Sequence, residues 1–184
     1  LFSVFNADAI KNVRLTKGGF PARFGGRLSS VLEIDMREGN QKEFGGDITL
    51  GLISSKFTFE GPIIKDRTSF LIAARRTYVD LIVGPFLPPS TDLRFYFYDF
   101  NAKINHKISK NDRIYLSAYM GNDVFGVDYD SSQEDNKDNN DNAEERDVLN
   151  FGLGFGNITS TLRWNHLFSD KMFSNTTLTY SRYS

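Results

Sequence analysis

Hydrophobic and polar residues alternate along most of the chain after residue 44. In Asp47–Leu52 every second residue is apolar, and this period of two predicts a β-strand. In Lys56–Glu60 the apolar positions fall on the opposite parity, which indicates a hairpin turn or a bulge at Ile53–Ser55. Similar patterns continue to the end of the chain. They predict about seven strands, over residues 47–52, 56–60, 69–82, 95–108, 112–122, 149–168 and 172–184.

The segments Phe95–Ile108 and Asp112–Asn122 show two-faced strands most clearly. One face of each is apolar or aromatic, whereas the other carries mainly Asn, Lys, Arg, Ser, Tyr and Gly. Leu149–Phe168 begins with leucine and phenylalanine opposite asparagine and glycine, and its phase changes near Asn157. We expect the glycine face of this segment to leave room inside the wall. Such strands suit a wall with lipid on one side and water on the other.

The lengths of the strands and of their connections point to the same architecture. Several of the predicted strands have 13 to 20 residues, whereas strands in globular sheets most often have about 5–6. Short connections at 61–68, 109–111 and 169–171 alternate with long ones at 83–94 and 123–148. This alternation is typical of an outer-membrane β-barrel. A soluble β-sandwich would more often have shorter strands without it.

Aromatic residues lie where a barrel would have its two interfacial girdles. Tyr96 and Tyr98 are next to a long connection, and Trp164 and Phe168 are next to a short one. Tyrosine and tryptophan favour the boundary between lipid and water. The pattern therefore predicts that the apolar band of the wall lies between these positions.

A compact, glycine-rich stretch, Lys17–Ile34, precedes the strand series. Glycine pairs permit bent or left-handed backbone, so this stretch predicts a turn leading into a short strand at Val31–Met36. A helical turn at 7–11 and an extended segment at 12–17 come before it, and a polar break at 37–43 follows. These pieces are too small to form a core of their own. The residues that mark the stretch are Gly18, Gly19, Gly25, Gly26, Arg23 and Arg27.

Composition narrows the classes of function. The 184 residues include no cysteine and two histidines, so neither a thiolate nor a histidine metal centre is expected. No stretch approaches the 18 apolar residues of a membrane helix. We find no nucleophile–base pair, no carboxylate dyad and no cofactor motif, and a net charge of −1 gives no case for nucleic-acid binding. The sequence therefore predicts a protein that is not an enzyme.

An acidic tract interrupts the strand series. Asp128–Asp147 contains nine acidic residues against Lys137 and Arg146, a net charge of −7 that leaves +6 for the rest of the chain. Such a tract buries too little apolar surface to order itself, so we expect a solvent-facing loop. It lacks the spacing and glycine of an EF-hand, so a calcium site is not favoured. Its candidate acidic positions are Asp128, Asp130, Asp135, Asp138 and Asp141.

Motifs near the start of the chain carry a family resemblance. Asp8–Gly18 and Ala22–Ile34 give a strand ending in glycine, a Phe-Gly turn and a last strand. Gly61-Pro62, Arg75–Tyr78 and Phe97–Lys103 follow in order. Together these segments resemble TonB-dependent outer-membrane receptors, at the point where the plug domain ends and the barrel begins. The resemblance spans essentially the whole chain.

The resemblance implies both a fold and a function. Residues 1–43 would be the C-terminal part of an internal plug domain, and residues 44–184 the first strands of a transmembrane antiparallel β-barrel of the 22-stranded class. Such receptors lie in the bacterial outer membrane and take up a scarce nutrient, such as an iron chelate, a glycan or a peptide. The chain begins at Leu1 without a methionine or signal pattern, so we expect it to be a piece of a longer polypeptide.

The expected partners follow from this interpretation. They are the TonB energy-transducing complex, acting through a segment outside this chain, the outer-membrane lipids, the transported ligand and, as a further candidate, a surface lipoprotein. Two alternatives stay open on the sequence alone. One is a small barrel of about eight strands without energised uptake, and the other is a soluble all-β binding module.

The two arginines of the glycine-rich stretch are the expected plug–barrel contacts. Inside a barrel, Arg23 and Arg27 would need carboxylate or carbonyl partners, because an unpaired buried charge is costly. Asp99 and Glu60 are the local candidates on the polar strand faces. Ordinary solvated turn arginines are the alternative. We expect the four glycines to keep this last turn of the plug small.

Overall fold

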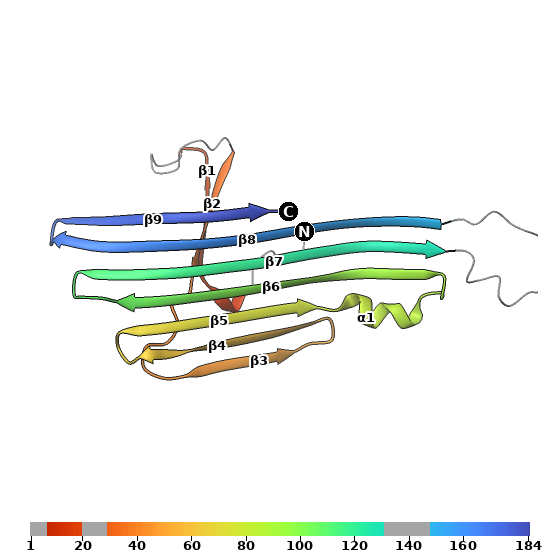
Figure 1. Cartoon of the computed structure of the whole chain (residues 1–184), viewed down its shortest axis with the longest axis horizontal. Helices are drawn as coiled ribbons and strands as arrows, with labels where there is room; N and C mark the ends of the chain where they lie inside the picture. Colours follow the sequence, from red (N-terminus) through yellow and green to blue (C-terminus); the bar gives the residue numbers. More distant parts are fainter. Residues whose placement is uncertain (1–6, 20–28, 131–147) are drawn as a thin grey trace, which may run out of the picture.

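The computed structural model describes residues 7–19, 29–130 and 148–184. An antiparallel sheet of seven strands, which neighbour one another in chain order from β3 to β9, dominates the structure (Figure 1). The all-β fold class predicted from the sequence is therefore confirmed. The strands are β3 Gly45–Leu50, β4 Ser54–Ile64, β5 Thr68–Thr77, β6 Thr91–Lys107, β7 Asp112–Asp130, β8 Val148–Ser169 and β9 Met172–Tyr183.

Several predicted strand boundaries differ from those of the structure, and two of the differences have identifiable reasons. β4 continues past Gly61 to Ile64, so the predicted turn at 61–68 shrinks, and its register shifts after Pro62 because proline has no N–H to donate. β5 ends at Thr77, whereas the sequence pattern predicted a strand to residue 82. A short helix, α1 Val79–Val83, and a 3₁₀ turn, η2 Gly84–Phe86, follow instead.

The sheet has two faces of opposite chemistry. Residues directly opposite one another on neighbouring strands share a face, so the register fixes both sets. We call inner the face that carries Asp99 and its neighbours, and outer the opposite face. Inner positions near the middle of the sheet are Ser69, Leu71, Ala73, Arg75, Asp99, Asn101, Lys103, Asn105, Arg113, Tyr115, Ser117, Thr159, Thr161 and Arg163. Outer positions there are Phe70, Ile72, Ala74, Phe100, Ala102, Ile104, Ile114, Leu116, Ala118, Met120, Ile158, Leu162 and Trp164.

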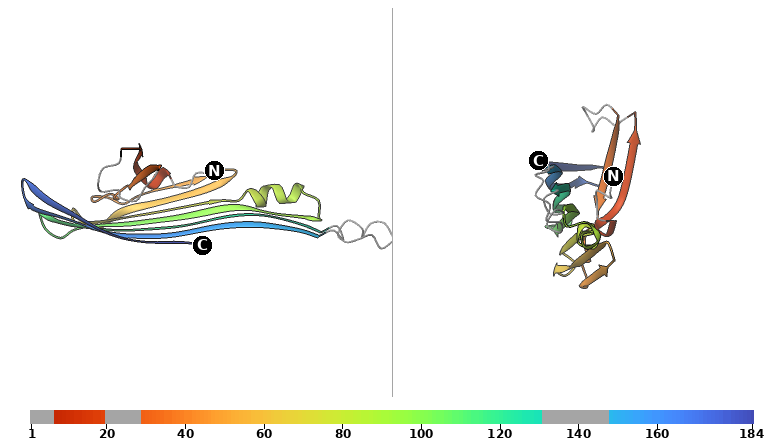
Figure 2. Two further views of the ribbon diagram at one scale, coloured as in Figure 1. Left: turned by 90° about the horizontal axis from the view of Figure 1, so that it is seen from above. Right: turned by 90° about the vertical axis from the view of Figure 1, so that its right-hand side faces the viewer.

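The N-terminal segment lies on the inner face (Figure 2). It comprises a 3₁₀ turn η1 Ala7–Ala9, the antiparallel strands β1 Ile10–Lys17 and β2 Ser30–Met36, and the connection at residues 37–43, so the predicted extended segment and strand are confirmed. Its small apolar core joins Ala9 and Met36 to Leu71 and Ala73 of β5. The helix α1 lies on the same side of the sheet, at the end where the long connections are.

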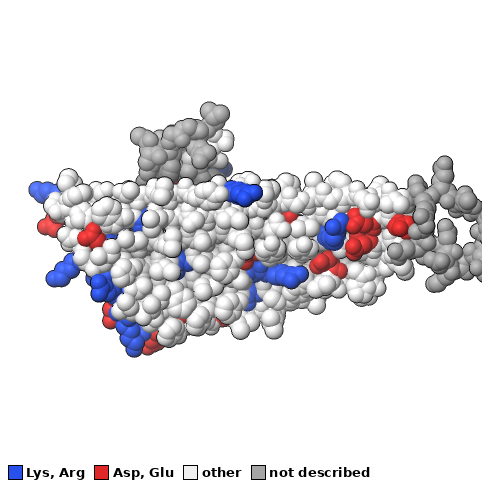
Figure 3. Space-filling view, viewed as in Figure 1, with Lys and Arg blue, Asp and Glu red and all other residues white. Residues whose placement is uncertain are grey.

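Polar residues fill most of the buried part of the inner face, whereas the outer face is apolar and exposed. Asp99, Lys103 and Asn105 are 4%, 6% and 0% exposed, although each carries a charge or an amide. On the outer face, Ile104 and Leu116 are 40% and 46% exposed. Figure 3 looks onto this face, which is mostly uncharged, with one group of acidic side chains near the long-connection end and others at the short-turn end. The usual relation between burial and polarity is reversed.

The sequence predicted a change of phase near Asn157. In the structure the pairing of the backbone continues there without interruption, and only the type of side chain on each face changes. β7 and β8 pair without any register shift from Asp112↔His166 to Asp130↔Val148. The leucines and phenylalanines of 149–155 therefore lie on the inner face. The glycines Gly152, Gly154 and Gly156 lie on the outer face, so the expectation that they leave room inside the wall is wrong.

Among the described residues, no helix is long and apolar enough to cross a membrane.

Candidate functional site

Polar contacts hold the N-terminal segment to the inner face, and four of them are 2.9 Å or shorter. The Arg37 guanidinium pairs with the Glu60 carboxylate at 2.5 Å, and Lys56 Nζ lies 2.9 Å from Asp8 Oδ2. Lys103 Nζ donates to the Met36 carbonyl and the Ser69 hydroxyl donates to the Glu38 carbonyl, both at 2.8 Å. Each partner on the sheet is an inner-face residue. The segment is thus bound mainly by hydrogen bonds and ion pairs.

A buried ion pair lies on the inner face beside these contacts. The Arg75 guanidinium is 2.6 Å from Asp99 Oδ2, and their side chains are 11% and 3% exposed. The two residues are directly opposite on β5 and β6. Asn101 donates to the other carboxylate oxygen at 3.3 Å, and the guanidinium lies 5.0 Å from the centre of the Phe97 ring. These contacts hold the Asp99 carboxylate in position on the inner face.

The predicted plug–barrel residues are only partly within the described chain. Asp99 pairs with Arg75, another residue of the sheet. Glu60 pairs with Arg37, so Glu60 does contact the N-terminal segment. Arg23 and Arg27 lie outside the described residues, as do Gly25 and Gly26, and their expected contacts stay predictions. Gly18 and Gly19 have φ angles of +68° and +59°, in the left-handed region that favours glycine.

The acidic positions expected in the loop divide in the same way. Asp128 pairs with Arg94 at 2.7 Å, and the backbone N–H of Asp130 donates to the Ser90 carbonyl at 2.9 Å. Both residues belong to β7, which continues farther than predicted. Asp135, Asp138 and Asp141 lie outside the described residues. In the part of the chain that the structure describes, no group of three or more His, Asp or Glu residues could hold a metal ion.

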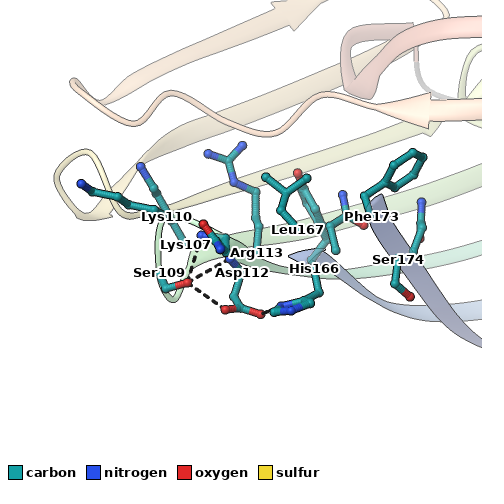
Figure 4. Close-up of a pocket in the computed structure, with 13 residues that line it drawn as sticks. Lys107, Ser109, Lys110, Asp112, Arg113, His166, Leu167, Phe173 and Ser174 are labelled. Carbon is teal, nitrogen blue, oxygen red and sulfur yellow. Dashed lines mark hydrogen bonds and ion pairs between the residues drawn. The ribbon is translucent and has the colours of Figure 1, made fainter. Parts of the chain in front are cut away.

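A cavity of about 370 Å³ opens at the short-turn end of the sheet, between the β6–β7 turn and strands β8 and β9 (Figure 4). Lys107, Lys110 and Arg113 line it together with Phe173. Arg113 also lies 3.9 Å from Glu38 of the N-terminal segment. The cavity therefore borders the polar contacts between that segment and the inner face.

Asp112 is the centre of a hydrogen-bond cluster at this turn, beyond the apolar middle of the outer face. His166 Nδ1 lies 2.6 Å from Asp112 Oδ1, the Ser109 hydroxyl donates to Oδ2 at 2.8 Å, and Trp164 Nε1 donates to Oδ1 at 3.1 Å. The hydrogen bonds from His166 and then Ser109 hold the pKa of Asp112 below its usual range. The cluster ties the β6–β7 turn to β8.

This lowered pKa predicts an acid-side loss of stability. Because the folded pKa lies below the unfolded one, near 3.9, the stabilisation is complete above about pH 4 and is lost as the pH falls through the folded pKa. Melting temperatures measured from pH 6 to pH 2.5 should fall less steeply below pH 4 in Asp112→Asn than in the wild type. Asp170→Asn, in the neighbouring short turn, is the control. Equal acid slopes in wild type and Asp112→Asn would contradict the assignment.

A second cavity, of about 320 Å³, lies on the inner face toward the long-connection end. Phe97, Asp123 and Phe155 line it as direct neighbours on β6, β7 and β8. Tyr119 also lines it, with its hydroxyl lying where a side chain of Gly121 would be. The absent side chain at Gly121 therefore leaves room for the Tyr119 ring. A concave site with apolar walls and a few polar groups is the usual form of a small-ligand site.

Comparisons with known proteins give no independent identification. No protein-family model, no curated protein and no solved structure matches this chain. The function has to be argued from the geometry described above.

Sequence reasoning missed Arg37, Arg75 and Asp123 as site residues. Arg75 and Asp99 become partners only through the register of β5 and β6, which the long connection between them does not determine. Arg37 lies in the polar break that the pattern predicted to be a connection. For Asp123 a signal was present, because it is an acidic residue within a run of aromatic and glycine positions, but the strand was predicted to end at 122.

Proposed function

We propose that this chain is part of a TonB-dependent outer-membrane receptor, with residues 1–43 as the end of the plug domain and residues 44–184 as the first strands of a large transmembrane barrel. The observation that carries the proposal is the reversed polarity of the sheet. Its buried inner residues are mostly polar, and its exposed outer residues are mostly apolar. The resemblance of its motifs to that family supplies the particular class of barrel.

The reversed polarity has a direct physical reason in a membrane. In water, an antiparallel sheet turns its apolar face toward a core, because exposed apolar area is unfavourable. Here the inner face, which the N-terminal segment covers, holds Asp99, Lys103 and Asn105. Lipid outside and a hydrated interior inside would satisfy both faces at once. This favours a transmembrane wall over a soluble all-β module.

The height of the outer apolar band agrees with a bilayer. It runs along β6 from Tyr96 to His106, and charged outer positions follow beyond each end, at Arg94 and at Asp112 of the neighbouring strand. Ten residues of strand span about 33 Å, which is about 25 Å in height at a tilt near 40°. The expected girdle residues Tyr96, Tyr98 and Trp164 all lie on this face.

The proposed mechanism is gated uptake. The ligand binds at the end with long connections, which would face the outside, and the TonB complex pulls on the plug from the periplasm to open a path. The polar contacts between the N-terminal segment and the inner face suit this role. Hydrogen bonds and ion pairs facing a hydrated interior can exchange for water, whereas a large apolar interface could not separate as readily.

These 184 residues contain no cysteine, and any cysteine elsewhere in the full polypeptide is first replaced with serine for the test. In the full polypeptide, single substitutions Leu116→Cys and Ser117→Cys place an environment-sensitive dye on the outer and inner faces at adjacent positions. In vesicles, we expect the dye at 116 to be quenched by nitroxide lipids and the dye at 117 by a water-soluble quencher. The protein should also fractionate with outer membranes and migrate heat-modifiably in gels.

The other outcomes separate the alternatives. Equal access of the water-soluble quencher to both dyes, in a protein that stays out of membranes, would leave the soluble all-β module. Lipid contact at 116 without any dependence of uptake on TonB would indicate a barrel that is not energised. Either result would refute the proposed receptor.

A further inference from the structure

The polarity of the sheet changes sides at its long-connection end. From the level of Phe97 toward the long connections, the inner face carries an aromatic wall, made of Phe95, Phe97, Phe125, Phe151, Leu153 and Phe155. Phe95 and Phe125 meet edge to face with ring centres 5.8 Å apart, and Phe125 and Phe151 do so at 6.1 Å. The ladder thus crosses three strands.

The outer face at this level is polar. Asp92 and Arg94 of β6 share it with Asp128 of β7 and Asn150 of β8. This change from an apolar to a polar outer face is expected if the outer face borders lipid in the middle of the sheet and water at the long-connection end. The aromatic wall is then an apolar surface on the inner side, and Phe151 and Phe155 are 47% and 61% exposed. Exposed apolar surface of this kind is a candidate for binding.

One carboxylate lies at the foot of the aromatic wall. Asp123 is directly opposite Phe97 on one side and Phe155 on the other, so two rings flank an acidic group in the 320 Å³ cavity. Among the described residues, neither a hydrogen bond nor an ion pair reaches its carboxylate. The nearby Asp99 is neutralised by Arg75. The negative charge of this cavity is therefore that of Asp123.

A carboxylate between aromatic rings selects for a cation. An ammonium group gains from the carboxylate and from the faces of the rings, whereas an anion is repelled by both. The wider charge distribution acts in the same direction, because Asp80, Asp92 and Asp130 lie at this end of the sheet. Such a field attracts cations toward the cavity.

We propose that the aromatic wall and Asp123 form a binding site for an amphipathic organic cation, an ammonium group attached to an aromatic or aliphatic body. The ammonium group lies at Asp123 and the body lies against Phe125, Phe151 and Leu153. The site rests on the proposed function in one respect, that the inner face borders the hydrated interior. It names the ligand class of that receptor.

Three small probes with one apolar body and different charges test this. The full polypeptide in dodecyl maltoside micelles is titrated with 2-phenylethylammonium, 2-phenylethanol and phenylacetate, and binding is followed by ligand-observed NMR. We expect the cation to bind about 10-fold more tightly than the alcohol, since an exposed ion pair and a cation–π contact together supply about that factor. Phenylacetate should bind most weakly.

Variants assign the effect to the two parts of the site. Asp123→Asn should lower the affinity for the cation toward that for the alcohol, and Phe151→Ala, at a ring that contacts the apolar body, should weaken binding of both compounds. Asp92→Asn removes an acid on the outer face at the same end, and it should change neither. Heat-modifiable migration of every variant checks that it is folded.

Two results would overturn the site: equal affinities for the three probes, or an unchanged preference for the cation in Asp123→Asn. Failure of the proposed receptor is a separate result, because binding in micelles does not depend on TonB. Cation binding without lipid contact at residue 116 would refute the receptor and leave the site. Lipid contact without selective binding would do the opposite.

Discussion

Replacing Gly39 with alanine is expected to detach the polar break from the sheet. Gly39 has a φ of +77°, and a Cβ there would lie 2.2 Å from the carbonyl oxygen of Phe70. The backbone conformation alone costs an alanine about 1–3 kcal/mol, and the overlap is with backbone that cannot rotate away. Residues 37–43 would have to lift off, which breaks the hydrogen bond between Ser69 and Glu38.

Hydrogen exchange measures this directly. Amides of residues 36–43 should exchange faster in Gly39→Ala, while those of β6 to β8 keep their protection. Gly152→Ala is the matched control, because a Cβ added at Gly152 would meet no atom within 4 Å and the φ of this glycine is not in the left-handed region. It should exchange like the wild type. Unchanged exchange at 36–43 in Gly39→Ala would show that this glycine does not position the segment.

The alternating pattern predicted the sheet well because side chains on a strand must alternate between faces. The hairpin between β3 and β4 was predicted at Ile53–Ser55 from a change of parity, and its turn lies at residues 51–53. The turn between β6 and β7 was predicted from Ser109–Asn111. The helix α1 was missed because Val79–Val83 continues the apolar run of β5. A helix of 5 residues shows too little of a 3.6-residue period to be told from a strand.

The sites were less predictable, because they depend on which residues the register brings together. The sequence marked Asp99 and Glu60 as candidates for pairing with Arg23 and Arg27, which lie outside the described residues. In the structure the two acids pair with other arginines. The partners, Arg75 and Arg37, follow from strand pairing and from the docking of the N-terminal segment. Neither is encoded in spacing along the chain.

The aromatic wall shows how an alternating pattern can be recognised correctly and still be assigned to the wrong face of the sheet. The alternation over 149–156 is visible in the sequence, and the simplest prediction places its apolar set on the same side as the apolar set of the strands before it. Phe97, Asp123 and Phe155 are direct neighbours on β6, β7 and β8 and therefore share one face. Because Phe97 is an inner residue, the apolar residues of 149–155 lie on the inner face too. Only pairing across three strands reveals this.

Replacing Arg75 with methionine is expected to cause a large loss of stability. Asp99 is 3% exposed and would be left without its 2.6 Å partner. Removing one member of a buried pair typically costs about 3–5 kcal/mol, because the remaining charge stays desolvated. Adding Asp99→Asn to Arg75→Met should restore part of the loss, since no uncompensated charge remains.

Arg94→Met is the matched control for this prediction. Arg94 pairs with Asp128 at a similar distance, 2.7 Å, but the two side chains are 48% and 33% exposed. Exposed pairs contribute at most about 1 kcal/mol, because water screens and solvates both charges. Denaturant midpoints in micelles compare the four proteins. Equal midpoints for Arg75→Met and Arg94→Met would mean that water reaches Asp99 freely, and the inner face would then be open in solution where the structure has it closed.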